Sequence, residues 1–341
     1  MKIIFAAYNA CIRTLKEGLA LCGQGHNVIF IQRELANRGM IYVLPLVSFY
    51  DGSKEHYVAK LKGYSGIDII HVHNEPSWLG YLAKEAHPGV PVVFDAHDLN
   101  AVRDDSVDAD EVRSMNVCDA VIFPSNGYRD YCLNEFKDIF TTLKDKPTEV
   151  IYSMCNEFMM NLPPLPRVGG IVYQGGTYVF VNYRDYRSLA DELRKRNIVF
   201  YIYHANKDET KDYADTGAVC MPTLPYLDLL RNLSRFDWGL VGSPVKSRQW
   251  DTAMPNKMFD YIAAGIPCLV YQAEEAAEFV TRHGLGVVVE SLDEIPQIYN
   301  QHEYYRKIVQ QKRHELTMEG QVNKILDIYN GLLDNRQAGQ R

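Results

Sequence analysis

The sequence has 341 residues, of which 47% are hydrophobic and 23% are charged, with a formal net charge of −7. This length predicts two domains, because single domains usually hold about 100–200 residues. No apolar stretch reaches the roughly 18 residues that a membrane-spanning helix needs. The seven cysteines are scattered and include no C-x-x-C pair. We therefore expect a cytoplasmic protein with free thiols rather than a disulfide framework. Attachment to the surface of a membrane is an alternative that the sequence leaves open.

Short β-branched strands alternate with amphipathic helices in the first half of the chain, as in a parallel sheet with crossover helices. We predict strands over residues 3–8, 28–32, 41–46, 68–73, 92–95, 120–124 and 149–152. We predict helices over residues 14–23, 54–62, 77–85, 108–115 and 127–136. The pattern breaks at a proline-rich stretch, residues 155–168, which we interpret as a linker.

The same alternation returns after the linker. The predicted strands are 170–174, 198–204, 218–221, 238–241, 267–271 and 286–289. The predicted helices are 185–196, 225–234, 256–264, 274–283, 302–315 and 318–333, before a polar tail over 334–341. The fold class is therefore α/β, with two Rossmann-like doubly wound domains facing across a cleft. They span 1–155 and 168–315, and the final segment, 316–341, is a helix expected to pack back toward the N-terminal domain.

Ligands of open parallel sheets bind beyond the carboxyl ends of the strands, so the loops there are the first candidates. The most informative one begins the segment PNKMFDYIAAGIP, residues 255–267. Pro255 opens a helix whose unpaired amides form an anion site. Lys257 places a positive charge in the first turn, which the helix dipole alone disfavours and a bound phosphate would offset. Asp260 can accept hydrogen bonds from a sugar diol. An ordinary helix with an exposed Lys and an exposed Asp, and without a ligand, explains this sequence equally well.

This segment resembles the donor-site signature P-x-K-x-x-E-Y-x-A-x-G-x-P of the retaining GT-B glycosyltransferases related to sucrose and glycogen synthases (glycosyl transferases group 1). The resemblance implies that Asp260, in place of the usual glutamate, holds the donor ribose, and that Lys257 lies near the phosphates. Pro255 and Asn256 belong to the same donor-binding turn. Thr252 stands where many members carry a glutamate that touches the donor sugar.

A second part of the resemblance is the strand and glycine loop at residues 171–177. Gly175 and Gly176 match the donor-domain glycine loop, with Gly176 replacing the family's arginine. Arg184 falls at the spacing of a family lysine that clamps the pyrophosphate, and its planar fork suits phosphate. Residues 222–238 are similar to the stretch that lines the nucleobase, although a core helix between two strands explains them as well.

In the N-terminal half, the strand at 92–95 leads into a loop that resembles the one reaching toward the donor sugar. By this resemblance His97 contacts the sugar and the reacting centre, and Asp98 supports the loop. Other residues that follow strands are expected on the acceptor side. Together the acceptor-side candidates are Asn9, Arg13, Asn74, Asp98 and Ser125.

No metal site is expected. Alternation places His71 and His73 on the same sheet face, near His97, but no carboxylate or cysteine lies at ligand spacing in the sequence. Asp108 and Asp110 match the D-x-D string of a different, metal-dependent glycosyltransferase fold. We interpret them as the acidic start of a helix. A G-x-G-x-x-G fingerprint is absent after the first strand, which argues against a nicotinamide enzyme.

We therefore expect an enzyme, a metal-independent hexosyltransferase-type glycosyltransferase with retention, without a cofactor and with a UDP- or GDP-linked sugar as co-substrate. Arg184, Lys257 and the helix amides would stabilise the departing diphosphate, and together with His97 these two side chains are the catalytic candidates. The acceptor is a saccharide, lipid-linked saccharide, protein or small molecule. Modified DNA is a minority option, and no stable nucleic-acid complex is expected. The alternatives are a sugar-nucleotide epimerase or hydrolase of the same fold, or a nucleotide-sugar-binding protein without turnover.

Overall fold

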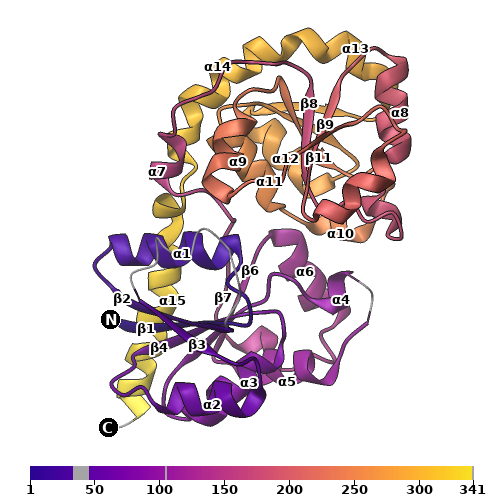
Figure 1. Cartoon of the computed structure of the whole chain (residues 1–341). Helices are drawn as coiled ribbons and strands as arrows, with labels where there is room; N and C mark the ends of the chain where they lie inside the picture. The colour runs from indigo at the N-terminus through magenta and orange to yellow at the C-terminus, as the bar shows by residue number, and fades with distance from the viewer. Residues whose placement is uncertain (34–45, 104–105, 340–341) are drawn as a thin grey trace. The chain divides into compact units, whose positions relative to one another are not determined.

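The computed structural model describes residues 1–33, 46–103 and 106–339 of the chain (Figure 1). The chain divides into two compact units. The first consists of Met1–Ser153 with Met318–Arg341, and the second of Met154–Thr317. The last helix therefore belongs to the first unit, and the proline-rich stretch belongs to the second. None of the described helices has the length and apolar character needed to cross a membrane.

The first unit contains a seven-stranded parallel sheet with the order β3-β2-β1-β4-β5-β6-β7. Its strands are β1 (Lys2–Ala7), β2 (Asn27–Arg33), β3 (Val47–Tyr50), β4 (Ile69–His73), β5 (Val92–Asp95), β6 (Ala120–Phe123) and β7 (Thr148–Val150). This is the doubly wound order. Strands β1 to β3 are added toward one edge of the sheet, and β4 to β7 are added from β1 toward the other edge. Most of the strand predicted over 41–46 lies outside the described residues, and β3 was not predicted.

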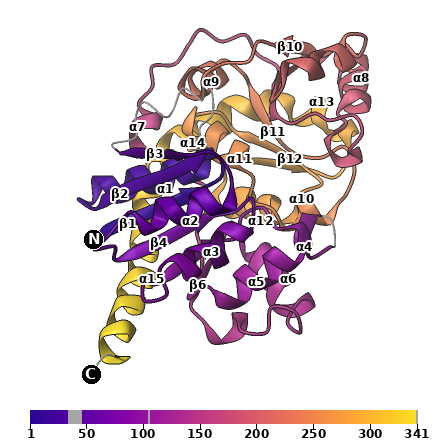
Figure 2. The same ribbon diagram turned by 60° about the horizontal axis from the view of Figure 1, so that its bottom comes forward.

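Helices cover both faces of this sheet. They are α1 (Ile12–Gly23), α2 (Lys54–Lys62), α3 (Trp78–Ala86), α4 (Asn100–Arg103), α5 (Ala109–Val117), α6 (Asn126–Glu135), α15 (Met318–Gly339) and the 3₁₀ helix η2 (Leu143–Asp145). Figures 1 and 2 show α1 on one side of the sheet and α2 and α3 on the other. Because side chains alternate along a strand, Ile4 and Ile70 join the apolar core beneath α2 and α3. Phe5 and His71, in contact with each other, lie on the opposite face.

The second unit repeats the same topology with six parallel strands in the order β10-β9-β8-β11-β12-β13. The strands are β8 (Ile171–Gly175), β9 (Phe200–His204), β10 (Val219–Met221), β11 (Trp238–Gly242), β12 (Cys268–Tyr271) and β13 (Gly286–Val289). The predicted α/β class with two Rossmann-like sheets is confirmed.

The helices of the second unit follow the predicted alternation. They are α7 (Glu157–Met160), α8 (Arg187–Lys195), α9 (Tyr226–Leu233), α10 (Arg248–Thr252), α11 (Asn256–Ala263), α12 (Glu274–His283), α13 (Ile295–Ile298) and α14 (His302–Lys312), with 3₁₀ helices η3 (Asn182–Arg184), η4 (Lys207–Tyr213), η5 (Leu292–Glu294), η6 (Tyr299–Gln301) and η7 (Arg313–Glu315). The short helices α7, α10 and α13 were not predicted.

Two local predictions have clear outcomes. Asp108 caps α5, since its side chain accepts a hydrogen bond of 2.7 Å from the Glu111 amide, so the D-x-D string is part of a helix start. The predicted polar tail over 334–341 was wrong for most of its length, because α15 continues to Gly339. No proline or glycine interrupts 334–338, so the polar side chains there continue the helix.

Gly18 allows α1 to approach β2 closely. A Cβ built at Gly18 would lie 2.2 Å from Cζ of Phe30, and Phe30 is buried. Gly23, the last residue of α1, has no neighbouring atom within 4 Å of the same position. The two glycines therefore form a matched pair in one helix.

We predict that Gly18→Ala destabilises the protein by about 1–3 kcal/mol through overpacking, despite its better helix propensity. Gly23→Ala should be neutral or stabilising by up to about 1 kcal/mol. Thermal denaturation midpoints of the two variants test this. A Gly18→Ala protein as stable as the Gly23→Ala protein would show that α1 can move away from the sheet at little cost.

Candidate active site

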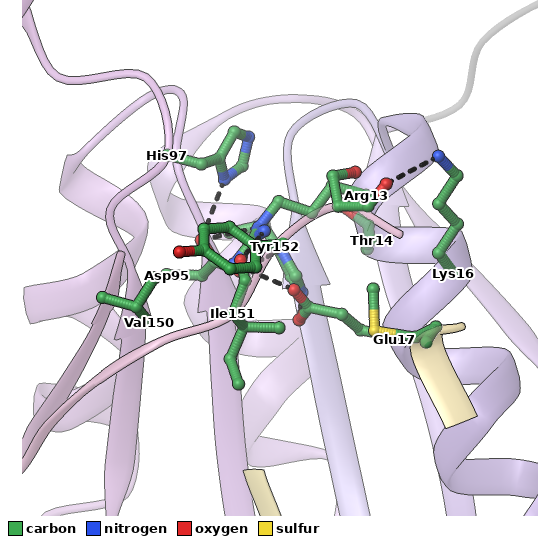
Figure 3. A network of polar contacts seen from close by, with 12 residues as sticks. Arg13, Thr14, Lys16, Glu17, Asp95, His97, Val150, Ile151 and Tyr152 are labelled. Atoms are coloured by element: carbon green, nitrogen blue, oxygen red, sulfur yellow. Dashed lines mark hydrogen bonds and ion pairs between the residues drawn. The ribbon is translucent and has the colours of Figure 1, made fainter. Parts of the chain in front are cut away.

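A buried polar network lies on the α1 face of the first sheet, at the carboxyl ends of β4 and β5 (Figure 3). His71 and His73 point to the same face, and their rings stack with centroids 4.6 Å apart. His73 is the register partner of Asp95, the last residue of β5. Glu17 reaches the group from the second turn of α1. All four side chains are almost fully buried.

Arg13 is the central cation of this network (Figure 3). Its Nε lies 2.8 and 3.1 Å from the two oxygens of Asp95, and its Nη2 lies 3.0 Å from Oε1 of Glu17. Its Nη1 donates a hydrogen bond to the carbonyl oxygen of Ile151. The predicted acceptor-side position of Arg13 is therefore corrected. Arg13 lies in the first turn of α1 and faces the sheet, so its side chain is 2% exposed.

The two carboxyl groups of the network differ in protonation. Burial raises the pKa of Glu17 well above its usual value; Arg13 opposes this, and the neighbouring Asp95 charge adds to it. Burial acts in the same direction on Asp95, but the Arg13 guanidinium and hydrogen bonds from His71 and His97 outweigh it and hold its pKa well below the usual range. One carboxylate and one protonated carboxyl thus share the guanidinium, and the buried charges balance.

His97 is oriented by this network. Its Nδ1 lies 3.2 Å from Oδ1 of Asp95, while its Nε2 lies 3.6 Å from the sulfur of Cys11. Burial disfavours the imidazolium, yet Cys11 and Asp95 raise the pKa of His97 well above its usual value. The ring is therefore held as a cation, with 14% of its side chain exposed.

Asn74 fixes the loop that carries His97. Its Oδ1 accepts hydrogen bonds from the amides of His97 and Asp98, at 3.0 and 3.1 Å. Its Nδ2 donates to the Asp98 carbonyl. Asn74 is buried, so its predicted acceptor-side position is corrected to a positioning role. Asp98 itself lies at the surface beside Arg103, at 3.5 Å.

The remaining acceptor-side candidates, Ser125 and Asn9, have different surroundings in the structure. Ser125 is buried and caps α6, because its Oγ accepts a hydrogen bond from the Tyr128 amide at 3.1 Å. Its predicted acceptor contact is corrected to this capping role. Asn9 is half-buried, and among the described residues its Oδ1 has no hydrogen-bond partner.

Glu17, His71, His73 and Asp95 each offer an atom to a group that lies within 4.8 Å, the spacing of a possible metal centre. Sequence reasoning found the histidines but missed both carboxylates, because α1 and β5 bring them in from distant segments. Arg13 already neutralises the Asp95 carboxylate and Glu17 holds a proton, so a divalent cation would add uncompensated charge to a buried cluster. The arrangement suits a proton-bearing network better than a metal.

The second unit gathers positive charge where β8 ends and α11 begins. Lys257 Nζ donates a hydrogen bond of 2.9 Å to the hydroxyl of Tyr173. It also lies 4.3 Å from the ring centroid of Tyr173 and 4.7 Å from that of Trp250. Burial and the charge of Arg184 lower the pKa of Lys257 to about 7. Sequence reasoning did not find Tyr173 or Trp250, because no motif distinguishes them from core aromatic residues.

The glycine pair lies beside both cations. A Cβ at Gly175 would lie 3.4 Å from Cε and Nζ of Lys257, and one at Gly176 would lie 3.1 Å from Nη1 of Arg184. Gly175 also has φ +132, a backbone conformation that other residues rarely adopt. Within the described part of the chain, neither Lys257 nor Arg184 forms an ion pair with a carboxylate. A side chain at either glycine would therefore crowd the cation beside it.

The start of α11 adds hydrogen-bond donors to this cluster. Pro255 occupies the N-cap position, and no side chain caps the helix. The unpaired first-turn amides of Asn256 and its neighbour carry the positive end of the helix dipole. Two cations and an uncapped helix start together form an anion-binding arrangement.

Asp260 does not stand free as a ligand for ribose. Its Oδ2 accepts a hydrogen bond from Gln174 Nε2 at 2.7 Å, and its Oδ1 accepts one from the Tyr226 hydroxyl at 2.5 Å. Cys155 also donates to it. The predicted direct role is corrected, because the shorter aspartate is buried among protein partners. Thr252 donates its hydroxyl hydrogen to the Arg248 carbonyl within α10.

Two family models match the chain, one for each unit. Residues 12–153 match the model described as Glycosyltransferase Family 4, and residues 179–320 match Glucosyltransferase 3-like, C-terminal domain. Both descriptions name sugar-transferring enzymes. The chain is a glycosyltransferase of the GT-B fold. A comparison with curated protein sequences finds no match.

Solved structures agree with this GT-B fold. A glycosyltransferase from Rickettsia africae is similar with a TM-score of 0.71 at 13% identity, covering 98% of this chain and 99% of that chain. Sucrose-phosphate synthase from Thermosynechococcus elongatus gives a TM-score of 0.69 at 14% identity, with 98% and 100% covered. HepE from Anabaena in complex with UDP-glucose gives 0.69 at 13% identity, with 96% and 99% covered. The likeness extends over the length of the glycosyltransferase chain.

The protonation of Glu17 generates a prediction for stability. The folded state holds this proton to a higher pH than the unfolded chain does. The contribution of Glu17 to the free energy of unfolding is therefore fully present below about pH 4.5 and is lost as the pH rises. Glutamine mimics the protonated acid. We predict that the stability of Glu17→Gln relative to the natural protein rises between about pH 5 and 8, by at most about 1.4 kcal/mol per pH unit.

Thermal denaturation of the two proteins across this pH range measures the difference. Glu85→Gln is the control, since Glu85 is a surface residue paired with Arg113, and its difference from the natural protein should not rise with pH. A Glu17→Gln difference that stays constant or falls with pH would show that Glu17 is ionised in the folded protein.

Proposed function

We propose that the donor is a nucleoside diphosphate sugar whose diphosphate binds at Lys257, Arg184 and the first amides of α11. The observation that carries this proposal is a pair of neighbouring cations without a carboxylate partner among the described residues. Burial and the charge of Arg184 lower the pKa of Lys257 and outweigh the opposing charge of Asp260, so the protonated lysine is disfavoured in the free site. A dianion placed there would relieve the repulsion and restore the charge of the lysine.

The same charges serve the chemistry. Negative charge builds on the nucleoside diphosphate as the bond to the sugar breaks, and preorganised cations and amides lower the energy of that state. We infer metal-independent transfer with retention, as the family resemblance implies, with the acceptor hydroxyl attacking on the face from which the diphosphate leaves. His97, whose pKa Cys11 and Asp95 raise well above its usual value, is the proposed catalytic residue of the first unit.

A uridine nucleotide is the first donor to test. Solved structures of HepE and of an alpha-glucosyltransferase contain UDP, and the alpha-glucosyltransferase is similar to this chain at 10% identity. Within the donor site, Asp260 is proposed to act indirectly by orienting Gln174 and Tyr226. Pro255, Asn256 and Thr252 remain proposed members of the donor pocket.

The acceptor is best identified by its chemistry. A saccharide, a lipid-linked saccharide, a protein or a small molecule is proposed, and modified DNA is a minority candidate. An alpha-glucosyltransferase structure includes DNA, but the net charge of this chain is −7, which disfavours a polyanion. An acceptor screen with labelled UDP-glucose separates these outcomes from free sugar, which indicates a hydrolase, and from an epimerised sugar.

We predict that Lys257→Met lowers the affinity for UDP-glucose about 10- to 100-fold, because one charge-assisted contact of about 1.5–3 kcal/mol is lost. At about pH 8 the free lysine is mostly neutral, since its pKa is about 7. Binding of the diphosphate raises that pKa, so the natural protein should take up nearly one proton on binding. Titration calorimetry in two buffers of different ionisation enthalpy measures both quantities.

The control is Lys246→Met in the same unit, because Lys246 is exposed and pairs with Glu274 at 2.7 Å. This variant should bind UDP-glucose with unchanged affinity and the same proton uptake. Equal donor affinities for Lys257→Met and Lys246→Met would overturn the donor-site assignment. Proton uptake that persists in Lys257→Met would assign the titration to another group.

A further inference from the structure

Cys11 forms the end of a hydrogen-bonded line with His97 and Asp95. The Cys11 sulfur lies 3.6 Å from Nε2 of His97, and Nδ1 of the same ring lies 3.2 Å from Oδ1 of Asp95. Asp95 is in turn held by Arg13. A nucleophile, an imidazole and a carboxylate that orients the imidazole are thus arranged in series, as in enzymes that activate a thiol.

The position of Cys11 in the fold favours the thiolate further. Cys11 is the N-cap residue of α1, where the positive end of a 12-residue helix stabilises an anion. The Thr14 hydroxyl lies 3.3 Å from the sulfur. Burial by itself raises the pKa of Cys11, but the charge and hydrogen bond of His97 and the contacts with Thr14 lower it to about 7. Arg13, two residues further along the chain, is another charged group that interacts with the sulfur.

We propose that Cys11 is a reactive thiolate site, paired with the His97 imidazolium, that takes low-molecular-weight disulfides and soft electrophiles. In the disulfide reaction, the Cys11 thiolate attacks one sulfur of an RS–SR molecule. A bond forms between Sγ and that sulfur, the original S–S bond breaks, and the departing RS⁻ takes a proton from water. Cys11 is oxidised to a mixed disulfide, and one half of the reagent is reduced to a thiol.

The other cysteines provide a contrast within the same chain. Cys118, Cys132, Cys155 and Cys268 are buried. Cys22 and Cys220 are half-buried like Cys11, yet burial raises the pKa of each. Cys22 lies in the last turn of α1, at the negative end of the helix that Cys11 begins. Cys220 contacts His204 at 3.2 Å, so a histidine neighbour alone does not lower the pKa of a thiol here.

Modification of Cys11 has a consequence for transfer that rests on the proposed function. A mixed disulfide removes the negative charge that helps to keep His97 protonated, and it places a new group beside the ring. We expect the adduct to slow sugar transfer, and a dithiol reductant to restore the rate. Donor binding should stay unchanged, because the proposed donor contacts lie in the second unit.

The direct test is alkylation of the natural protein with iodoacetamide at limiting reagent, followed by mass spectrometry of each cysteine-containing peptide. At pH 7 we expect Cys11 to react about five to ten times faster than Cys22 or Cys220, since its larger thiolate fraction outweighs its lower intrinsic nucleophilicity. The pH–rate curve of Cys11 should have its midpoint near 7. In His97→Gln that midpoint should move toward the ordinary value of 9.0.

Equal alkylation rates for Cys11 and Cys22 in the natural protein would overturn the proposal without any variant. A fast Cys11 whose midpoint is unchanged in His97→Gln would overturn the pairing with the imidazolium. Calorimetric binding of UDP-glucose to the oxidised protein keeps this test separate from the donor assignment. Loss of donor affinity in Lys257→Met concerns the proposed function alone.

Discussion

The buried ion pair between Arg13 and Asp95 is the constraint on which the first unit depends. It joins the first turn of α1 to the last residue of β5, with 2.8 Å between Nε and Oδ2, and the guanidinium also contacts Glu17 and the Ile151 carbonyl. Removing one partner of such a pair leaves a buried charge and typically costs about 3–5 kcal/mol. Because Asp95 also holds Nδ1 of His97, the same pair fixes the orientation of the candidate catalytic ring.

The two units treat charge in opposite ways. In the first, burial raises the pKa of Glu17 and favours its protonated form, so that one guanidinium and one carboxylate balance. In the second, Lys257 and Arg184 are close enough to interact electrostatically and have no carboxylate ion-pair partner among the described residues, and the rings of Tyr173 and Trp250 lie beside the lysine. A balanced cluster is stable by itself, whereas an unbalanced one is completed by an anionic ligand. This difference is why we propose a positioning role for the first cluster and diphosphate binding for the second.

The sequence predicted the elements well, because strands and helices here follow hydrophobic periodicity and end at glycine or proline. It also brought His97, Lys257 and Arg184 forward through motif resemblance. Burial could not be predicted in the same way. Arg13 was expected in a loop because it follows the first strand closely, but α1 begins at Ile12 and turns the side chain toward the sheet. Glu17 belongs to no motif, and nothing distinguishes Tyr173 within the 171–177 segment. Only the packing of α1 on the sheet and of α11 beside β8 makes these two residues part of a site.

Departures from the family signature compensate one another in space. The family's arginine after the first glycine is Gly176 here, and a Cβ at that position would lie 3.1 Å from Nη1 of Arg184. The guanidinium of Arg184 therefore lies close to the position from which a side chain at residue 176 would project. The shorter acid Asp260 is engaged in hydrogen bonds with Gln174 and Tyr226, and we propose that these two side chains contact the nucleoside in its place. If the positive charge of the donor site is kept but is carried by a different residue, the site can still stabilise a departing diphosphate. Such a site can differ from its relatives in the donor it selects.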